Sequence, residues 1–193
     1  MTDTPQQPIP RKLFPLRDSG GFHRWTFEPR EYPALPEALR AQLGGIESTV
    51  REDGHRYWPV QAILNDGKTI DCVCVMDAGA YMASFERPWP ELLRDAETIS
   101  VLDVAAFREC PLRLPPALVD KLRATEEFKF GAWAYSLILK GGATWPVSVG
   151  VLLDFTCLPS GLSVADIVDV TPLISGELHE AGTHSWCLAT GVE

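Results

Sequence analysis

The stretch that decides the fold runs from Trp58 to Met76 and reads WPVQAILNDGKTIDCVCVM. Two runs rich in apolar residues flank the triplet Asn65-Asp66-Gly67. Apolar runs on either side of such a triplet are typical of a β-hairpin, because Asn, Asp and Gly tolerate the backbone conformations that reverse the chain. We therefore predict two antiparallel strands joined at these three residues.

The length of this turn decides which side chains share a face. A two-residue Asp-Gly turn pairs Leu64 with Thr69 and mixes polar with apolar side chains. A three-residue loop, with Gly67 in the left-handed conformation, pairs Leu64 with Lys68 and separates the two kinds. We predict the three-residue loop. The buried face then consists of Trp58, Val60, Ala62, Ile70, Cys72, Cys74 and Met76.

A similar stretch begins 75 residues later, from Trp133 to Val151, and reads WAYSLILKGGATWPVSVGV. Both stretches open on Trp, and the glycine and threonine of the first turn recur as Gly142 and Thr144. We predict a second hairpin, with the loop Gly141-Gly142-Ala143. Its buried face would consist of Trp133, Tyr135, Leu137, Leu139, Trp145, Val147, Val149 and Val151.

Leucines spaced by four residues predict a short helix before each hairpin. Pro36 and Pro115 suit the first turns of these helices, and the glycines at 44 and 45 suit the end of the first. The leucines are Leu35, Leu39 and Leu43 in the first helix, and Leu114, Leu118 and Leu122 in the second. Short strands are expected after the hairpins, at 99–104 and 166–170.

These elements predict an α+β fold with a mainly antiparallel sheet, short helices and two related helix–hairpin–strand halves. Residues 1–21 would form an extended N-terminal arm. The first αββ-type half would span 22–110 and the second 111–193, the two packed as one globular unit around a core that contains Trp58 and Trp133. Coincidence between two ordinary αββ segments is the alternative to an internal duplication.

The charge of the chain narrows its possible partners. Its 193 residues include 17 Lys and Arg against 26 Asp and Glu, a net charge of −9 at pH 7. This balance argues against nucleic acid and anionic membranes, which attract clustered Lys and Arg. It favours a basic protein partner or simply solubility. The N-terminus lacks the apolar run of a secretory signal, and we expect a cytoplasmic protein.

The cysteines are odd in number and follow no disulfide framework. We expect reduced thiols, with Cys72 and Cys74 in the core. His179, His184 and Cys187 carry zinc-binding groups, but their spacing matches no standard zinc site, and surface histidines beside a packed cysteine are the simpler interpretation. We predict neither a metal nor a cofactor.

The sequence contains no G-x-S-x-G elbow and no phosphate-binding glycine loop. Asp103 and Asp169 occupy matching positions in the two halves, where a symmetric acid pair could act in catalysis, although turn capping is the commoner role of Asp. We predict no catalytic residues and expect a protein that is not an enzyme.

The first hairpin is the more acidic of the two at its ends and on its outer face. An acidic sheet face suits electrostatic docking onto a basic protein. In size and charge the chain resembles the small acidic immunity proteins of bacteria, which neutralise toxins by covering them. We expect a non-enzymatic cytosolic protein-binding module, and an acidic inhibitor or immunity-type protein that covers a basic partner is one form of it. The predicted partner-binding residues are Glu52, Asp53, Asp66, Asp71 and Asp77.

Two alternatives use other features. A small hydrolase or ligand-binding domain would place a pocket between the halves, with polar groups from Asp103, Asp169, His179 or His184. A structural subunit of a larger assembly would account for the six Trp residues.

Overall fold

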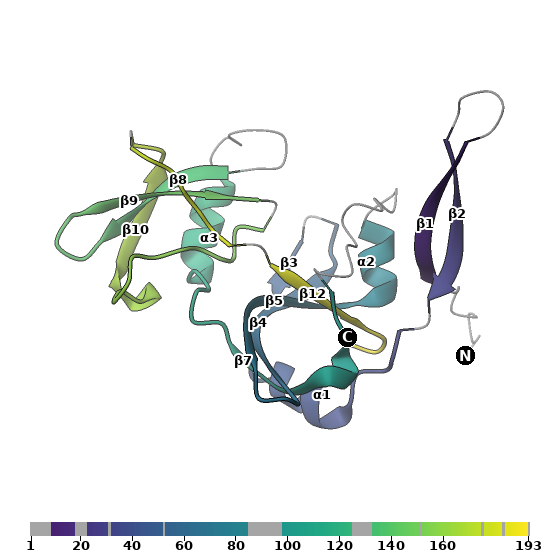
Figure 1. The fold of residues 1–193 in the computed structure, drawn as a ribbon. Coiled ribbons are helices and arrows are strands. Elements are labelled where there is room, and N and C mark those ends of the chain that lie inside the picture. Colours follow the sequence, from purple (N-terminus) through teal and green to yellow (C-terminus); the bar gives the residue numbers. More distant parts are fainter. Residues whose placement is uncertain are drawn as a thin grey trace.

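The computed structural model describes residues 9–17, 23–30, 32–51, 53–84, 98–124, 133–150, 152–174, 176–182 and 184–192. These residues form a six-stranded sheet, a four-stranded sheet, a separate hairpin and three short α-helices (Figure 1). The separate hairpin pairs β1 (Ile9–Arg17) with β2 (His23–Arg30) in antiparallel fashion. The α+β class is confirmed.

The six-stranded sheet is built around the first predicted hairpin. Its strands are β3 (Thr49–Val50), β4 (Arg56–Leu64), β5 (Thr69–Asp77), β6 (Thr98–Ile99), β7 (Val104–Glu109) and β12 (Ser185–Ala189). β3 and β7 pair with successive parts of β4, on the side away from β5. β12 lies between β5 and β6 and runs parallel to both, so this sheet is mixed.

The first turn has the predicted length. The Leu64 N–H donates to the Lys68 carbonyl at 2.8 Å, and Gly67 has φ +84°. A residue with a Cβ is strained in this left-handed conformation, which explains the glycine.

The prediction of one buried hairpin face is wrong beyond Asp71. Cys72 has φ +57°, and the β4–β5 register breaks between Val60 and Ala62, so the structure has a β-bulge here. Beyond the bulge, Val73 and Val75 join the face of Val60 and Ala62. Cys72, Cys74 and Met76 belong to the cluster on the opposite face. Both faces of β5 can be apolar because β4 and β12 flank it and other segments cover both sides.

The four-stranded sheet contains the second hairpin and has the order β10-β8-β9-β11. Its strands are β8 (Trp133–Leu139), β9 (Thr144–Val149), β10 (Ile167–Pro172) and β11 (His179–Glu180). β8 pairs antiparallel with β9 and β10, whereas β11 runs parallel to β9. This sheet is mixed too, so the parallel pairs of both sheets come from strands near the C-terminus.

The second turn begins one residue earlier than predicted. The Leu139 N–H donates to the Ala143 carbonyl at 2.8 Å, which makes Lys140, Gly141 and Gly142 the loop. The loop still has three residues, so the odd-numbered side chains of both strands share a face as predicted.

Two of the helices follow the predicted pattern. α1 (Glu37–Leu43) begins after Pro36 and ends where the Gly44 N–H donates to the Arg40 carbonyl at 3.0 Å. α3 (Pro116–Arg123) begins after Pro115. α1 packs against β7 and α3 against β10. The third helix, α2 (Ala78–Ser84), follows β5 directly and was not predicted.

The predicted strand at 99–104 is wrong over most of its length. The Ser100 hydroxyl accepts a hydrogen bond from the Leu102 N–H, and the chain forms the 3₁₀ turn η2 (Val101–Asp103) before β7 begins. A second 3₁₀ turn, η3 (Val164–Asp166), leads into β10. The strand predicted at 166–170 corresponds to β10.

Three apolar clusters form in place of the single predicted core. The first lies between the six-stranded sheet and α1, and Trp58 packs against it. The third lies between the four-stranded sheet and α3, and Trp133 packs against it. The middle cluster joins Tyr57, Cys72, Cys74, Met76, Ala78, Ala80, Tyr81, Cys110, Leu152, Phe155, Trp186 and Leu188. Because Leu152 and Phe155 follow β9, this middle cluster connects the segment after the second hairpin to the first sheet.

Candidate functional site

A buried carboxylate lies at the edge of the middle cluster. Asp154 is only 2% exposed, and it accepts hydrogen bonds from the hydroxyls of Thr49 on β3 and Tyr57 on β4. Its backbone carbonyl accepts the Leu114 N–H at 2.8 Å. A buried carboxylate is costly unless donors satisfy it, so these contacts hold the segment after β9 against the first sheet.

The Tyr57 hydroxyl is held in its protonated, donating form. Burial raises the pKa of Tyr57 far above its usual value, and the neighbouring Asp154 carboxylate raises it further. Both effects act in the same direction, because a tyrosinate here would be poorly solvated and would lie beside a negative charge.

Two thiols meet on the same side of the sheet. The Sγ atoms of Cys72 and Cys110 are 4.0 Å apart, and both residues are buried. The pKa of Cys110 is lowered to about 7 by a hydrogen bond from the Cys72 thiol and by the backbone N–H groups of Leu112 and Cys72. The pKa of Cys72 is raised by the same thiol–thiol contact and by burial. Cys110 is therefore the more readily ionised thiol of the pair.

Cys74 belongs to the same apolar cluster as the thiol pair. Burial raises the pKa of Cys74 well above its usual value, and the nearby Asp154 and Cys110 add to the shift. The neutral Cys74 thiol is therefore part of the packing, as predicted for a core cysteine.

The acidic residues predicted to bind a partner are spread along the first hairpin. Asp66 lies in the β4–β5 turn, where Lys68 Nζ is 2.7 Å from its carboxylate. Asp53 precedes the opposite end of β4 and pairs with Arg51 at 3.2 Å. Glu52 lies outside the described residues. These positions do not form one compact patch.

The remaining two acids of this set have different roles. Asp71 is exposed on β5 and accepts a hydrogen bond from Gln61 at 2.7 Å. Asp77 caps α2 by accepting the Gly79 N–H at 2.8 Å, and its other oxygen accepts the Gly191 N–H at 3.0 Å. Asp77 thus ties β5, α2 and the segment after β12 together.

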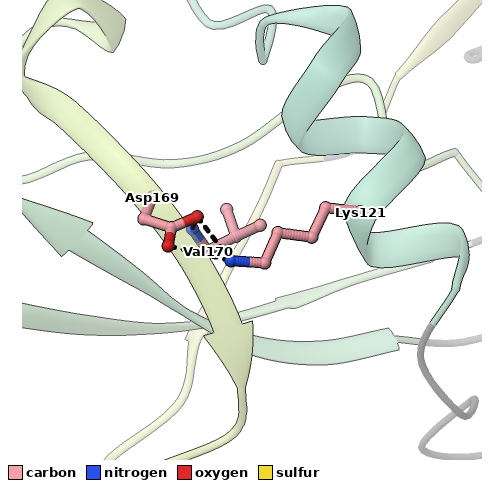
Figure 2. A network of polar contacts seen from close by, with 3 residues as sticks. All are labelled: Lys121, Asp169 and Val170. Carbon is pink, nitrogen blue, oxygen red and sulfur yellow. Dashed lines mark hydrogen bonds and ion pairs between the residues drawn. The ribbon is translucent and has the colours of Figure 1, made fainter.

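Asp103 ends η2 beside the six-stranded sheet and Asp169 lies on β10 of the four-stranded sheet, so they are not brought together as an acid pair. Asp169 on β10 faces α3, and Lys121 Nζ lies 2.7 and 2.8 Å from its two oxygens (Figure 2). Lys121 lowers the pKa of this carboxyl. Asp103 ends η2, where its carbonyl accepts the Asn65 N–H at 2.8 Å. Each aspartate has a local structural role.

The three residues with zinc-binding groups are also separated. His179 on β11 stacks on Trp145 with the ring centroids 3.6 Å apart, whereas His184 meets Trp186 edge-on beside β12. Cys187 is fully buried in the first cluster. Among the described residues no group of three His, Cys, Asp or Glu side chains could hold a metal ion.

One strand edge and its neighbours are open to solvent. Among the described residues β10 pairs only with β8, which leaves its other edge unpaired. Val168 on this strand is 54% exposed, and Leu173 and Ile174, which follow it directly, are exposed as well. We call these three residues and the outer edge of β10 the β10 edge surface.

Sequence reasoning did not identify the buried carboxylate or the thiol pair. A signal for the first exists, since Asp154 is a single charge in the apolar run VLLDFTCL that begins at Val151. Nothing in the sequence pairs Cys72 with Cys110, because their contact depends on the bulge.

Comparisons with protein-family models, curated proteins and solved structures gave no match. Within the described part of the chain, no helix is long and apolar enough to cross a membrane.

Proposed function

We propose that this protein is a non-enzymatic, cytosolic protein-binding module of the acidic inhibitor or immunity type, and that it covers a basic protein partner. The β10 edge surface is the observation that carries the proposal. An unpaired strand edge offers a row of backbone N–H and C=O groups that an extended segment of a partner can pair with. The exposed side chains of Val168, Leu173 and Ile174 would add apolar contacts.

The segment that forms the four-stranded sheet is acidic, which favours a basic partner. Between residues 133 and 182 the sequence has one Lys and no Arg. The acidic residues of the same span are Asp154, Asp166, Asp169, Glu177 and Glu180. Glu177 and Glu180 are exposed. Complementary charge speeds the encounter of two proteins and weakens as salt rises, which makes this part of the proposal testable.

Affinity capture with matched variants tests the proposal. Val168→Lys places a charge on the unpaired edge, and Leu102→Lys places the same charge in η2, beside the other sheet, at a leucine that is 64% exposed. We expect wild type and Leu102→Lys to retain a cytosolic protein at low salt, and Val168→Lys to lose it. Equal capture by all three, or capture that does not respond to salt, would contradict the proposal.

We also propose that the two sheets are related units, as the sequence pattern suggested. In each sheet a 3₁₀ turn leads into a strand that pairs antiparallel with the first hairpin strand, β7 with β4 and β10 with β8. The second hairpin strand has a parallel neighbour in each, β12 for β5 and β11 for β9. Matching order and direction across four strands support a duplication more strongly than the hairpins alone.

The pairing registers add detail to this relation. In both units the hairpin turn donates a backbone N–H to the last residue of the 3₁₀ turn at 2.8 Å, Asn65 to Asp103 and Lys140 to Asp166. β7 and β10 follow these two turns. In each, the pairing register with the hairpin strand shifts after the first pair. The pairs on either side of the break are Leu64 with Val104 and Ile63 with Ala106, and Leu139 with Ile167 and Ile138 with Asp169.

Cross-strand backbone contacts measured by NMR test this relation. We expect the register break in both units. If the register break is absent from either unit, the pairing registers no longer support a duplication. The assignment of β12 to a unit differs from the sequence-based division at 110/111, because β12 lies after that boundary but pairs with β5.

A further inference from the structure

We propose that Cys72 and Cys110 form a dithiol site that hydrogen peroxide oxidises to a reversible disulfide. Their Sγ atoms are 4.0 Å apart in the middle cluster, where Cys72 lies on β5 and Cys110 follows β7. A disulfide requires about 2 Å between the sulfurs, so oxidation must bring the two residues closer together than they lie in the reduced protein. This redox site is separate from the proposed partner-binding site, because neither cysteine belongs to the β10 edge surface.

The backbone of Cys72 supports the assignment. Among the described residues, Cys72 is the one non-glycine residue with a positive φ. Glycine is the usual occupant of such a bulge position, because a Cβ makes the left-handed conformation unfavourable. Strained residues cluster at functional sites, and here the strain accompanies a side chain that is directed at a second thiol.

The surroundings of Cys110 supply a nucleophile. The thiolate, and not the thiol, attacks oxidants. The pKa of Cys110 is about 7, because the Cys72 thiol and the backbone N–H groups of Leu112 and Cys72 stabilise its charge.

The chemistry balances in two steps. The Cys110 thiolate attacks one peroxide oxygen, the O–O bond breaks, and hydroxide leaves and takes up a proton to form water. The Cys72 sulfur then attacks the sulfenic sulfur of Cys110, loses its proton and displaces the hydroxyl group as a second water. The two thiols are oxidised by two electrons and one peroxide is reduced to two waters. A small thiol such as dithiothreitol reverses the reaction.

The other cysteines provide the competing outcomes. Cys157 is the only one of the five that is partly exposed, and burial raises its pKa. Oxidation governed by exposure alone would therefore modify Cys157 first. Cys74 lies two residues from Cys72, and its pKa is raised well above the usual value. Oxidation of Cys74 in place of Cys72 is the second competitor.

The test uses the full chain, reduced, freed of reductant and treated with hydrogen peroxide. Remaining thiols are alkylated under denaturing conditions, and disulfides are mapped by tryptic digestion without reduction. Cleavage after Arg94 and Arg108 separates the peptides of Cys72 and Cys110, so a link between them joins two peptides. We expect the loss of two thiols, a link between these peptides, and recovery of both thiols with dithiothreitol. The rate should rise with a midpoint near pH 7.

Variants assign the link to its residues. Cys74→Ser and Cys157→Ser should still form it, whereas Cys72→Ser and Cys110→Ser should not. If a Cys72 variant fails to fold, formation of the link in Cys74→Ser still assigns it to Cys72, because Cys72 and Cys74 lie on one tryptic peptide. Oxidation confined to Cys157, a link that needs Cys74, no thiol loss, or a rate midpoint near the ordinary cysteine pKa of 9.0 would each overturn the proposal.

Discussion

The hydroxyl of Tyr57 donates a hydrogen bond to the buried carboxylate of Asp154, 97 positions later in the chain. This contact joins β4 to the segment after β9, next to a second donor from Thr49. Removal of one donor leaves a buried charge with fewer partners, which costs more than removal of a hydrogen bond between neutral groups.

Tyr57→Phe should therefore destabilise the protein by about 2 kcal/mol, in the range for loss of a hydrogen bond to a charged group. Tyr135→Phe is the matched control, because Tyr135 is also buried and its hydroxyl meets the neutral Thr156 hydroxyl at 3.4 Å. Its loss should be smaller, about 0.5 to 1 kcal/mol. Urea denaturation measures both. A Tyr57→Phe loss no greater than that of Tyr135→Phe would contradict the importance of the carboxylate contact.

Alkaline pH should weaken the fold through the same tyrosine. The pKa of Tyr57 is raised in the folded state above its ordinary value of 10.0, so the folded protein keeps a proton that the unfolded chain releases. The stabilising contribution is complete below pH 10 and is lost as the pH rises above it. The free energy of unfolding should fall above pH 10 in wild type, and less steeply in Tyr57→Phe. Parallel profiles would show that Tyr57 is not responsible.

The bulge at Cys72 should reverse the usual order of stability between an Ala and a Gly variant of a strand residue. In a regular strand Gly is less favourable than Ala, but at φ +57° Gly is the favoured residue. Cys72→Gly should be more stable than Cys72→Ala by about 1 kcal/mol. Cys74 is the control, since it lies in a regular part of the same strand, and there Cys74→Ala should be the more stable variant. The same order at both positions would argue against the bulge.

Replacing Asp77 should destabilise the protein more than replacing Asp71, because Asp77 caps a helix whereas Asp71 is exposed on a strand. Asp77→Ala removes the cap of α2 and the contact to Gly191, and should cost about 1 to 2 kcal/mol. Asp71→Ala removes a contact to Gln61 at an exposed position and should change stability by less than about 0.5 kcal/mol. Thermal unfolding monitored by circular dichroism measures both. Equal losses would show that the Asp77 contacts add little.

Local sequence rules predict some parts of this fold well. The first turn follows from side-chain parity, because only a three-residue loop separates polar from apolar residues around Leu64. The helix after Pro36 follows from leucine spacing, since Leu39 and Leu43 are both buried on one side. In each case the residues that decide the structure are neighbours in sequence.

Other parts depend on contacts that sequence patterns do not reveal. The flip of β5 at Cys72 arises because a strand covered on both faces no longer needs one apolar and one polar side. The parallel position of β12 and the partners of Asp154 depend on residues about a hundred positions away. The candidate site is built from these long-range contacts, which is why its residues were missed.

The position of β12 predicts an order of folding. Ser185 pairs with Val73, 112 positions earlier, whereas the four strands of the second sheet all lie between Trp133 and Glu180. Closing a longer loop costs more chain entropy and slows folding. The second sheet can therefore assemble first from nearby segments. The first sheet stays without its central parallel strand, with one edge of β5 exposed to other chains, until the more distant segment arrives.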